Sequence, residues 1–208
     1  MEKSLVNRKK GDVIMDRILD TGSYGICLFS IEVLQDFLKK EKVRTKKILK
    51  NFQDNHNRYL ASLENGIWIP FLPINSIEYI IKLENCNQSF DDEWEEKFVY
   101  HDFNIEVKDS LWIADIGSFY EFDKNEFLGN EEVSYETLDG KTLYSGFRYS
   151  VSSGKYSVSI KGYVRKNKLD YPNSNFGFLF SLKKVNEFKS FNDPREDERY
   201  NFNVAKIV

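Results

Sequence analysis

The chain has 208 residues, of which 41% are hydrophobic and 15% aromatic, so it can bury a core without disulfides or structural metals. A formal net charge of −3 excludes the strongly basic profile that is typical of a general nucleic-acid binder. The cysteines (Cys27, Cys86) and histidines (His56, His101) lack the local spacing of a zinc site, so we expect reduced thiols and no bound metal or other cofactor.

Residues 1–19 include several basic side chains but no apolar stretch long enough for the central region of a signal peptide. No run in the chain approaches the roughly 20 apolar residues of a membrane span. We therefore expect a cytoplasmic protein that has no membrane partner.

The stretch ILDTGSYG at 18–25 looks like the glycine-rich loop of a protein kinase, but its first glycine position is Asp20. No strand-borne lysine follows, and the residue five beyond Asp102 in HDFN is Val107 instead of a metal-binding asparagine. These departures argue against a kinase. We interpret Thr21–Gly25 as a turn between two short segments, 13–19 and 26–29, which could form a strand pair.

The spacing of apolar residues from Ser30 to Leu63 is helical and predicts a helical pair or one broken helix. Ser30 is placed to cap its start, and Asn65-Gly66 to stop its end. The same region holds a basic run, which is expected to be a solvated helix surface or, alternatively, a phosphate-contacting one. This run consists of Lys39, Lys40, Lys42, Arg44, Lys46, Lys47 and Lys50.

From Gly66 onward the apolar period changes to two, which predicts half-buried strands. The predicted strands cover 77–83, 99–107, 133–138, 143–151, 156–164 and 176–182. Asp139-Gly140 is expected to turn the chain into a hairpin, and Ser152-Ser153-Gly154 to close a second one. The longest polar interruption, 84–96, is the best candidate for a mobile loop.

These elements predict an α+β fold in a single domain, 1–208, with a helical N-terminal part (1–64) and an antiparallel β part (65–208). The helical segment spans about 30–64. It is followed by a curved, mainly antiparallel sheet of six to eight strands, which could be barrel-like.

The acidic segment around Trp94 is the first candidate for a binding site. A large aromatic ring among carboxylates can anchor in a pocket while the charges steer a basic partner. The segment lacks the residue pattern of a calcium loop, so a solvated loop is the alternative to a protein-binding one. Its residues are Asp91, Asp92, Glu93, Trp94, Glu95 and Glu96.

The polar side of the predicted second hairpin is a second candidate. It mixes aromatic and cationic side chains, as a platform for single-stranded nucleic acid does, although an ordinary solvent-facing sheet has the same composition. Its residues are Tyr144, Arg148, Lys161, Tyr163 and Arg165.

His101 is the one candidate for a general base. Alternation within 98–107 places it in the apolar phase, so we favour a core histidine, and it places Asp102 on the opposite face. No nucleophile motif surrounds any serine or cysteine, so no catalytic residue is assigned.

The favoured hypothesis is a non-enzymatic module that binds another protein, which is basic and encoded nearby, through the acidic loop and the sheet surface. Its most concrete version is an immunity-type inhibitor that neutralises a toxin. In being small, acidic and rich in Lys, Asn, Ile, Phe and Tyr, the chain resembles bacterial immunity proteins, although no diagnostic residues carry this resemblance. The alternatives are a single-stranded nucleic-acid-binding protein and a small enzyme centred on His101.

Overall fold

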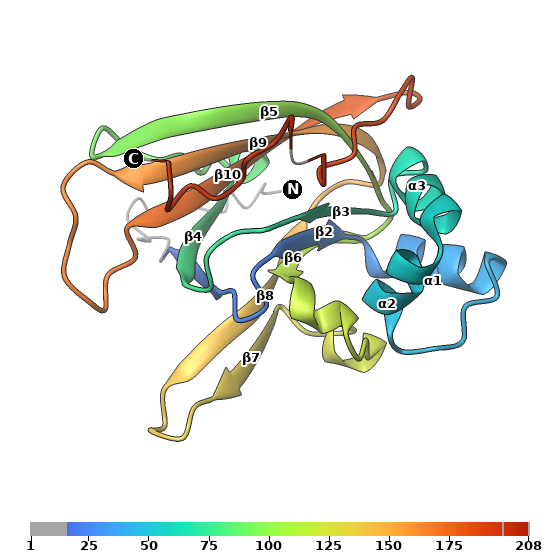
Figure 1. The fold of residues 1–208 in the computed structure, drawn as a ribbon, viewed down its shortest axis with the longest axis horizontal. Coiled ribbons are helices and arrows are strands. Elements are labelled where there is room, and N and C mark those ends of the chain that lie inside the picture. The colour runs from blue at the N-terminus through green and yellow to red at the C-terminus, as the bar shows by residue number, and fades with distance from the viewer. Residues whose placement is uncertain (1–15, 197, 208) are drawn as a thin grey trace, which may run out of the picture.

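The strands form two sheets, and the helices cover the outer face of one of them (Figure 1). The computed structural model describes residues 16–196 and 198–207. The helices are α1 (Ile31–Lys40), α2 (Ile48–Asp54) and α3 (His56–Glu64), with short 3-10 helices η1 (Glu84–Cys86), η2 (Ile116–Phe119) and η3 (Lys124–Glu126). The strands are β1 (Arg17–Asp20), β2 (Ile26–Phe29), β3 (Trp68–Phe71), β4 (Glu78–Leu83), β5 (Trp94–Val107), β6 (Ser110–Asp115), β7 (Glu132–Glu136), β8 (Thr142–Ser150), β9 (Gly154–Arg165) and β10 (Phe176–Val185).

Sheet A has the strand order β1-β4-β10-β9-β5, and sheet B has the order β3-β2-β6-β8-β7. All neighbouring strands are antiparallel except β4 and β10, which are parallel. The α+β class and the mainly antiparallel pairing are therefore confirmed. The expectation of a single barrel-like sheet is wrong, because two open sheets pack face to face.

Sheet B lies between two hydrophobic cores. Along β2, Ile26 and Leu28 face the core between the sheets, whereas Cys27 and Phe29 face the core beneath the helices. β3 and β6 divide their residues between the two cores in the same way. Because both faces of these strands are covered, they consist of continuous apolar runs.

The helical segment predicted over 30–64 is confirmed, and it contains three helices. Their apolar faces pack on sheet B, where the ring of Trp68 stacks on Phe119 at 5.0 Å and its indole N–H donates to Ser62 Oγ at 2.8 Å. Ser30 precedes α1, but its hydroxyl donates to Glu32 and makes no cap hydrogen bond. The predicted stop is confirmed, since Gly66 follows α3 with a φ of 65°.

Thr21 to Tyr24 form the predicted turn, in which the Tyr24 amide donates to the Thr21 carbonyl at 3.3 Å. The strands on either side do not pair with each other, so the expected strand pair is wrong. β1 pairs with β4 in sheet A, and β2 pairs with β3 and β6 in sheet B. The turn thus leads the chain from one sheet to the other; residues 13–15 of the first predicted segment lie outside the described residues.

The second predicted hairpin is also wrong in its pairing. Both strands exist, but β8 belongs to sheet B and β9 to sheet A, and the short connection at 151–153 crosses between the sheets. Alternation indicates that one face of a strand is buried. It does not distinguish a strand's hydrogen-bonded neighbour from the strand that packs against its face.

The hairpin predicted through Asp139-Gly140 is confirmed as β7 and β8, with Gly140 at a φ of 78°. The predicted strands 77–83, 99–107 and 176–182 correspond to β4, β5 and β10. The first part of the chain is not purely helical, because β1 and β2 are strands of the two sheets. Within the described residues, none of the helices has the length and apolarity needed to cross a membrane.

Gly66 gives a direct test of the packing between α3 and β5. A Cβ on this residue would lie 2.7 Å from the Phe188 ring and 3.0 Å from the Glu106 amide nitrogen. We expect Gly66→Ala to lower the free energy of unfolding by roughly 2–3 kcal/mol, through backbone strain and overlap together. Chemical denaturation measures the change.

Gly129→Ala is the matched control, because Gly129 also has a positive φ, 79°, and its Cβ would meet nothing within 4 Å. It should cost about 1 kcal/mol from backbone strain alone. Equal losses in the two variants would contradict the packing described for Gly66.

Candidate functional site

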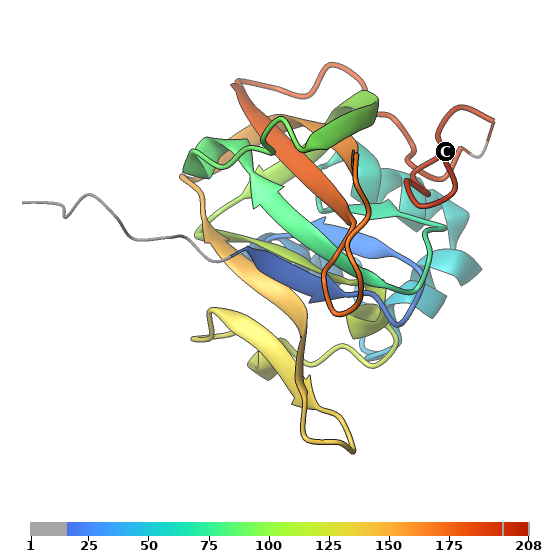
Figure 2. The same cartoon turned by 90° about the vertical axis from the view of Figure 1, so that its left-hand side faces the viewer.

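The β7–β8 hairpin projects from the body of the molecule as an arm (Figures 1 and 2). β7 lies at the edge of sheet B, pairs with β8 alone in the described chain, and has four exposed residues out of five. An uncovered strand edge offers backbone donors and acceptors to another chain.

The other three sheet edges are covered over all or part of their length. β3 is buried along its length and contains Pro70. β1 lies against β8, where Arg17 donates to the Arg148 carbonyl at 2.5 Å. The C-terminal segment covers the second half of β5, where Asn192 donates to the His101 carbonyl at 3.1 Å and Asn104 donates to the Ser190 carbonyl at 2.9 Å. The arm therefore presents an open edge that projects from the molecule.

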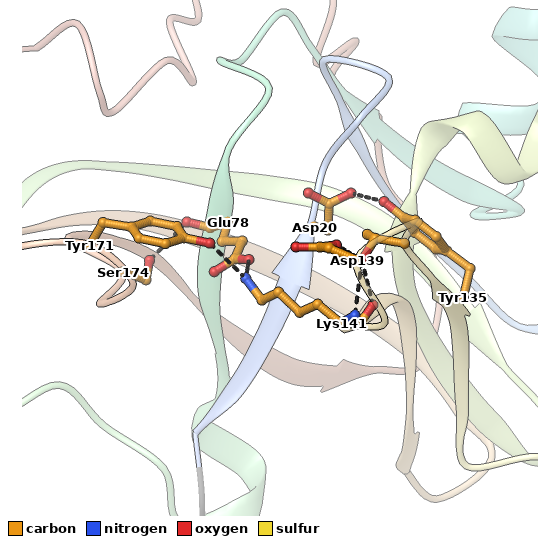
Figure 3. A network of polar contacts seen from close by, with 8 residues as sticks. Asp20, Glu78, Tyr135, Asp139, Lys141, Tyr171 and Ser174 are labelled. Atoms are coloured by element: carbon orange, nitrogen blue, oxygen red, sulfur yellow. Dashed lines mark hydrogen bonds and ion pairs between the residues drawn. The ribbon is translucent and has the colours of Figure 1, made fainter.

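A polar network joins the tip of the arm to sheet A (Figure 3). The Lys141 ammonium donates to the Glu78 carboxylate at 2.9 Å and lies 3.4 Å from the Tyr171 hydroxyl. Ser174, in the β9–β10 connection, donates to the Glu78 carbonyl at 2.8 Å. Lys141 thus ties together one residue from β4 and one from the β9–β10 connection. These contacts hold the arm at a defined position against the edge of sheet A.

Tyr135 is the central residue of the arm and is surrounded by carboxylates. Its hydroxyl donates to Asp20 at 2.7 Å, and this bond, with burial and the charges of Asp20, Asp115 and Glu78, raises the pKa of Tyr135 to about 12. Its hydroxyl is therefore protonated and donating at neutral pH, while the residue as a whole is 46% exposed.

Asp115 is the most buried of these carboxylates. Burial raises its pKa to about 6, against the backbone hydrogen bonds that it accepts from Ser23 and Gly117 at 3.2 Å. The charge of Asp20 raises the pKa further. A positive charge bound nearby would offset both the burial of the ionised Asp115 carboxylate and its repulsion by Asp20. None of these carboxylates belongs to a metal-ligating cluster within residues 16–196 and 198–207.

Large apolar side chains are exposed around the same network. Leu138 is fully exposed at the tip of the arm and Tyr171 is 83% exposed beside Lys141, while Ile18 lines a small cavity of about 120 Å³ with Asp20 and Glu78. We call this region the arm surface. It comprises Ile18, Asp20, Glu78, Tyr135, Glu136, Leu138, Asp139, Lys141 and Tyr171.

The predicted acidic segment is not arranged as the sequence suggested. Trp94 is 7% exposed, and the Arg165 guanidinium lies over its ring at 4.5 Å. Phe90 packs between Trp94 and Tyr163, at 4.7 and 4.5 Å from their rings. The indole is therefore not displayed to a partner, although the carboxylates of Asp91, Asp92, Glu93, Glu95 and Glu96 are exposed.

The predicted sheet-face residues are not brought together as one group. Lys161, Tyr163 and Arg165 share the outer face of β9, whereas Tyr144 and Arg148 lie on β8 in the other sheet. The β9 residues contact the acidic segment instead of solvent alone. Arg165 pairs with Glu93 at 2.5 Å, and the Tyr163 hydroxyl donates to Glu96 at 2.9 Å. Arg148 pairs with Asp109 and Glu131 at 2.8 and 2.7 Å.

The prediction that His101 lies in the core is wrong, because its side chain is exposed. The register of β5 against β9 shifts between Tyr100 and Phe103, and Asp102 takes a φ of 66°. Such a bulge breaks the alternation on which the prediction depended. As a result, His101 contacts Ser159 at 2.8 Å, and Asp102 accepts from Ser157 on the same face of β9.

A second segment of the chain has the same combination of residues as the acidic segment around Trp94. The stretch EEVSYETLDG at 131–140 also places an aromatic residue among carboxylates, and here the ring is half exposed. The segments around Trp94 and Tyr135 differ in how far neighbouring side chains cover the aromatic ring. Trp94 lies on the edge of sheet A beneath Arg165, whereas Tyr135 touches Asp20 of β1 through its hydroxyl and leaves about half of its surface exposed.

Comparison with protein families, characterised proteins and solved structures finds no match for this chain. Its function has to be argued from its own residues.

The titration of Asp115 can be measured directly. Since its pKa is raised in the folded state, the linked stability is fully present below about pH 4 and is lost as the pH rises through about 6. Between these limits, wild type should gain up to about 3 kcal/mol on acidification relative to Asp115→Asn. Denaturation at a series of pH values measures the difference.

Carboxyl NMR of the wild-type protein should place the midpoint of Asp115 near 6, and Asp20→Asn should lower it, because Asp20 contributes to the rise. A midpoint near 4 in the folded wild type would contradict the burial described for this group.

Proposed function

We propose that the protein is a non-enzymatic binding module that recognises a basic protein through the arm surface. One observation carries the proposal: exposed aromatic and aliphatic side chains stand beside carboxylates at an uncovered strand edge. Tyrosine is among the residues that most often dominate binding energy, and clustered charges mainly increase the rate and selectivity of association.

The charge of the arm favours a basic partner. The arm carboxylates Glu132, Glu136 and Asp139 form no ion pair among the described residues, whereas both arm cations are paired. Lys141 pairs with Glu78, and Arg148 pairs with Asp109 and Glu131. A lysine or arginine of the partner inserted near Tyr135 would meet the Asp20 carboxylate, and the buried charge of Asp115 would add to the attraction at longer range. The exposed carboxylates of 91–96 would extend the attraction beyond the contact area.

Neutralisation of a partner is the most specific form of this proposal. An immunity-type inhibitor would bind a basic toxin encoded nearby and block its active surface. Co-expression of that neighbouring protein with wild type and with an arm variant tests this form separately from binding itself.

The two alternatives have less support. A single-stranded nucleic-acid platform needs free cations and aromatics on one face, but Arg165, Arg148 and Tyr163 are engaged by carboxylates. An enzyme centred on His101 needs a group that orients the ring, and among the described residues its side chain bonds to Ser159 alone.

The binding proposal predicts that Tyr135→Ala combined with Leu138→Ser weakens the interaction about ten-fold or more, because both exposed contacts are removed. Affinity capture from the source cells, quantified by mass spectrometry, identifies the protein that depends on the arm. Calorimetry with that purified protein over a salt series then gives the affinity, which should fall as salt rises.

Tyr120→Ala combined with Leu128→Ser is the matched control, since these residues are 52% and 46% exposed outside the arm. It should leave capture unchanged. If both double variants capture the same proteins in the same amounts as wild type, the arm is not the binding site.

A further inference from the structure

A groove at the end of α1 is lined by cations from three segments. Lys39 comes from α1, Lys42 and Arg44 from the α1–α2 connection, and Lys124 from η3. The groove encloses about 620 Å³. Residues 39–50 carry seven Lys or Arg and one Glu, a net charge of +6, in a chain whose net charge is −3. Positive charge is thus concentrated at this place.

The groove cations lack the partners that neighbouring lysines have. Lys46 pairs with Asp123 at 3.0 Å and Lys47 with Glu121 at 3.6 Å. Within residues 16–196 and 198–207, the four groove cations form no ion pair. The one carboxylate that lines the groove, Asp36, is held by Lys108 at 2.5 Å, which lowers the pKa of Asp36. Uncompensated like charges repel one another, and a bound anion would remove this repulsion.

Lys42 occupies a backbone position that glycine normally takes. α1 ends in a Schellman motif. The Val43 amide donates to the Leu38 carbonyl at 2.9 Å, and the Lys42 amide donates to the Lys39 carbonyl at 3.1 Å. The φ of Lys42 is 55°, in the left-handed region.

α3 ends in the same motif. The Ile67 amide donates to the Ser62 carbonyl at 2.9 Å, and the Gly66 amide donates to the Leu63 carbonyl at 3.0 Å. There the left-handed residue is Gly66, with a φ of 65°. The chain therefore uses glycine at one of these helix ends and accepts a strained lysine at the other. The helix dipole accounts for Lys39 in the last turn, but not for a lysine in this conformation.

Gln35 adds a separate feature. Its side-chain amide nitrogen is buried and has no acceptor among the described residues, and the residue lines the groove. A buried donor without a partner is costly, and a turn of the Gln35 amide toward the groove would let an anion oxygen accept from it.

We propose that this groove binds a chain of linked phosphate groups, as in a polyphosphate or the phosphate tail of a nucleotide. Four cations spread around 620 Å³ suit several connected anionic groups better than one. Arg44 offers a planar fork to phosphate oxygens, and the lysines offer mobile point charges. The site differs from the arm surface in charge and in position, so it does not depend on the binding function proposed above.

The Lys42→Gly variant is expected to keep or raise the stability of the protein and to weaken its binding of linked phosphates. Because glycine suits the left-handed conformation, the variant should melt at the same temperature as wild type or higher. Its affinity for inorganic tripolyphosphate at low salt should nevertheless fall about five-fold or more. Calorimetry and thermal denaturation of the full chain measure the two effects.

Lys168→Gly is the control, because Lys168 is exposed in the β9–β10 connection and lines no part of the groove. Its affinity for tripolyphosphate should equal that of wild type. Absence of tripolyphosphate binding at low salt, or equal weakening in the two variants, would overturn the proposal.

Two further ligands identify the chemistry. Inorganic phosphate should bind much more weakly than tripolyphosphate, and equal affinities would overturn the assignment to linked phosphates. A thymidine oligonucleotide is the second ligand. If it binds more tightly than tripolyphosphate, and binds Lys42→Gly as tightly as wild type, the phosphate contacts belong to a nucleic-acid surface outside the groove. That result would also overturn the proposal.

Discussion

The fold depends on sheet B being buried on both faces. Its central strands β2 and β6 separate the core between the sheets from the core beneath the helices, so neither core can form without them. On β6, Ile113 faces the first core, while Trp112 and Ala114 face the second. A polar residue on either face would leave an unsatisfied group in an apolar layer. This requirement leaves the edges of the sheets as the place for exposed polar side chains.

The sequence predicted the elements well and their pairing poorly. Helical spacing over 30–64 and alternation over 77–83, 133–138 and 176–182 are local properties, and each reports the burial of one element. Whether a strand lies beside its successor or crosses to another sheet depends on contacts that are distant in sequence. β1 was expected to pair with β2, and β8 with β9, but in both cases the two strands lie in different sheets.

The candidate site was predictable in its chemistry and not in its location. An aromatic residue among carboxylates occurs at Trp94 and at Tyr135, and the sequence alone ranks the larger ring first. The structure separates them because Arg165, on the neighbouring strand, covers Trp94. His101 shows a related limit: one bulge moved its side chain from the expected buried face to solvent.

The chain crosses between the sheets four times, at 21–25, 72–77, 108–109 and 151–153, and this has a consequence for how the protein folds. Sheet A joins the first and the last strands of the described chain, β1 and β10, and the strands of the two sheets alternate along the sequence between them. The native contacts join residues far apart in sequence, which favours slow and cooperative assembly. We therefore expect the two sheets to gain and lose their structure together, and a fragment containing the strands of one sheet to be unstable on its own.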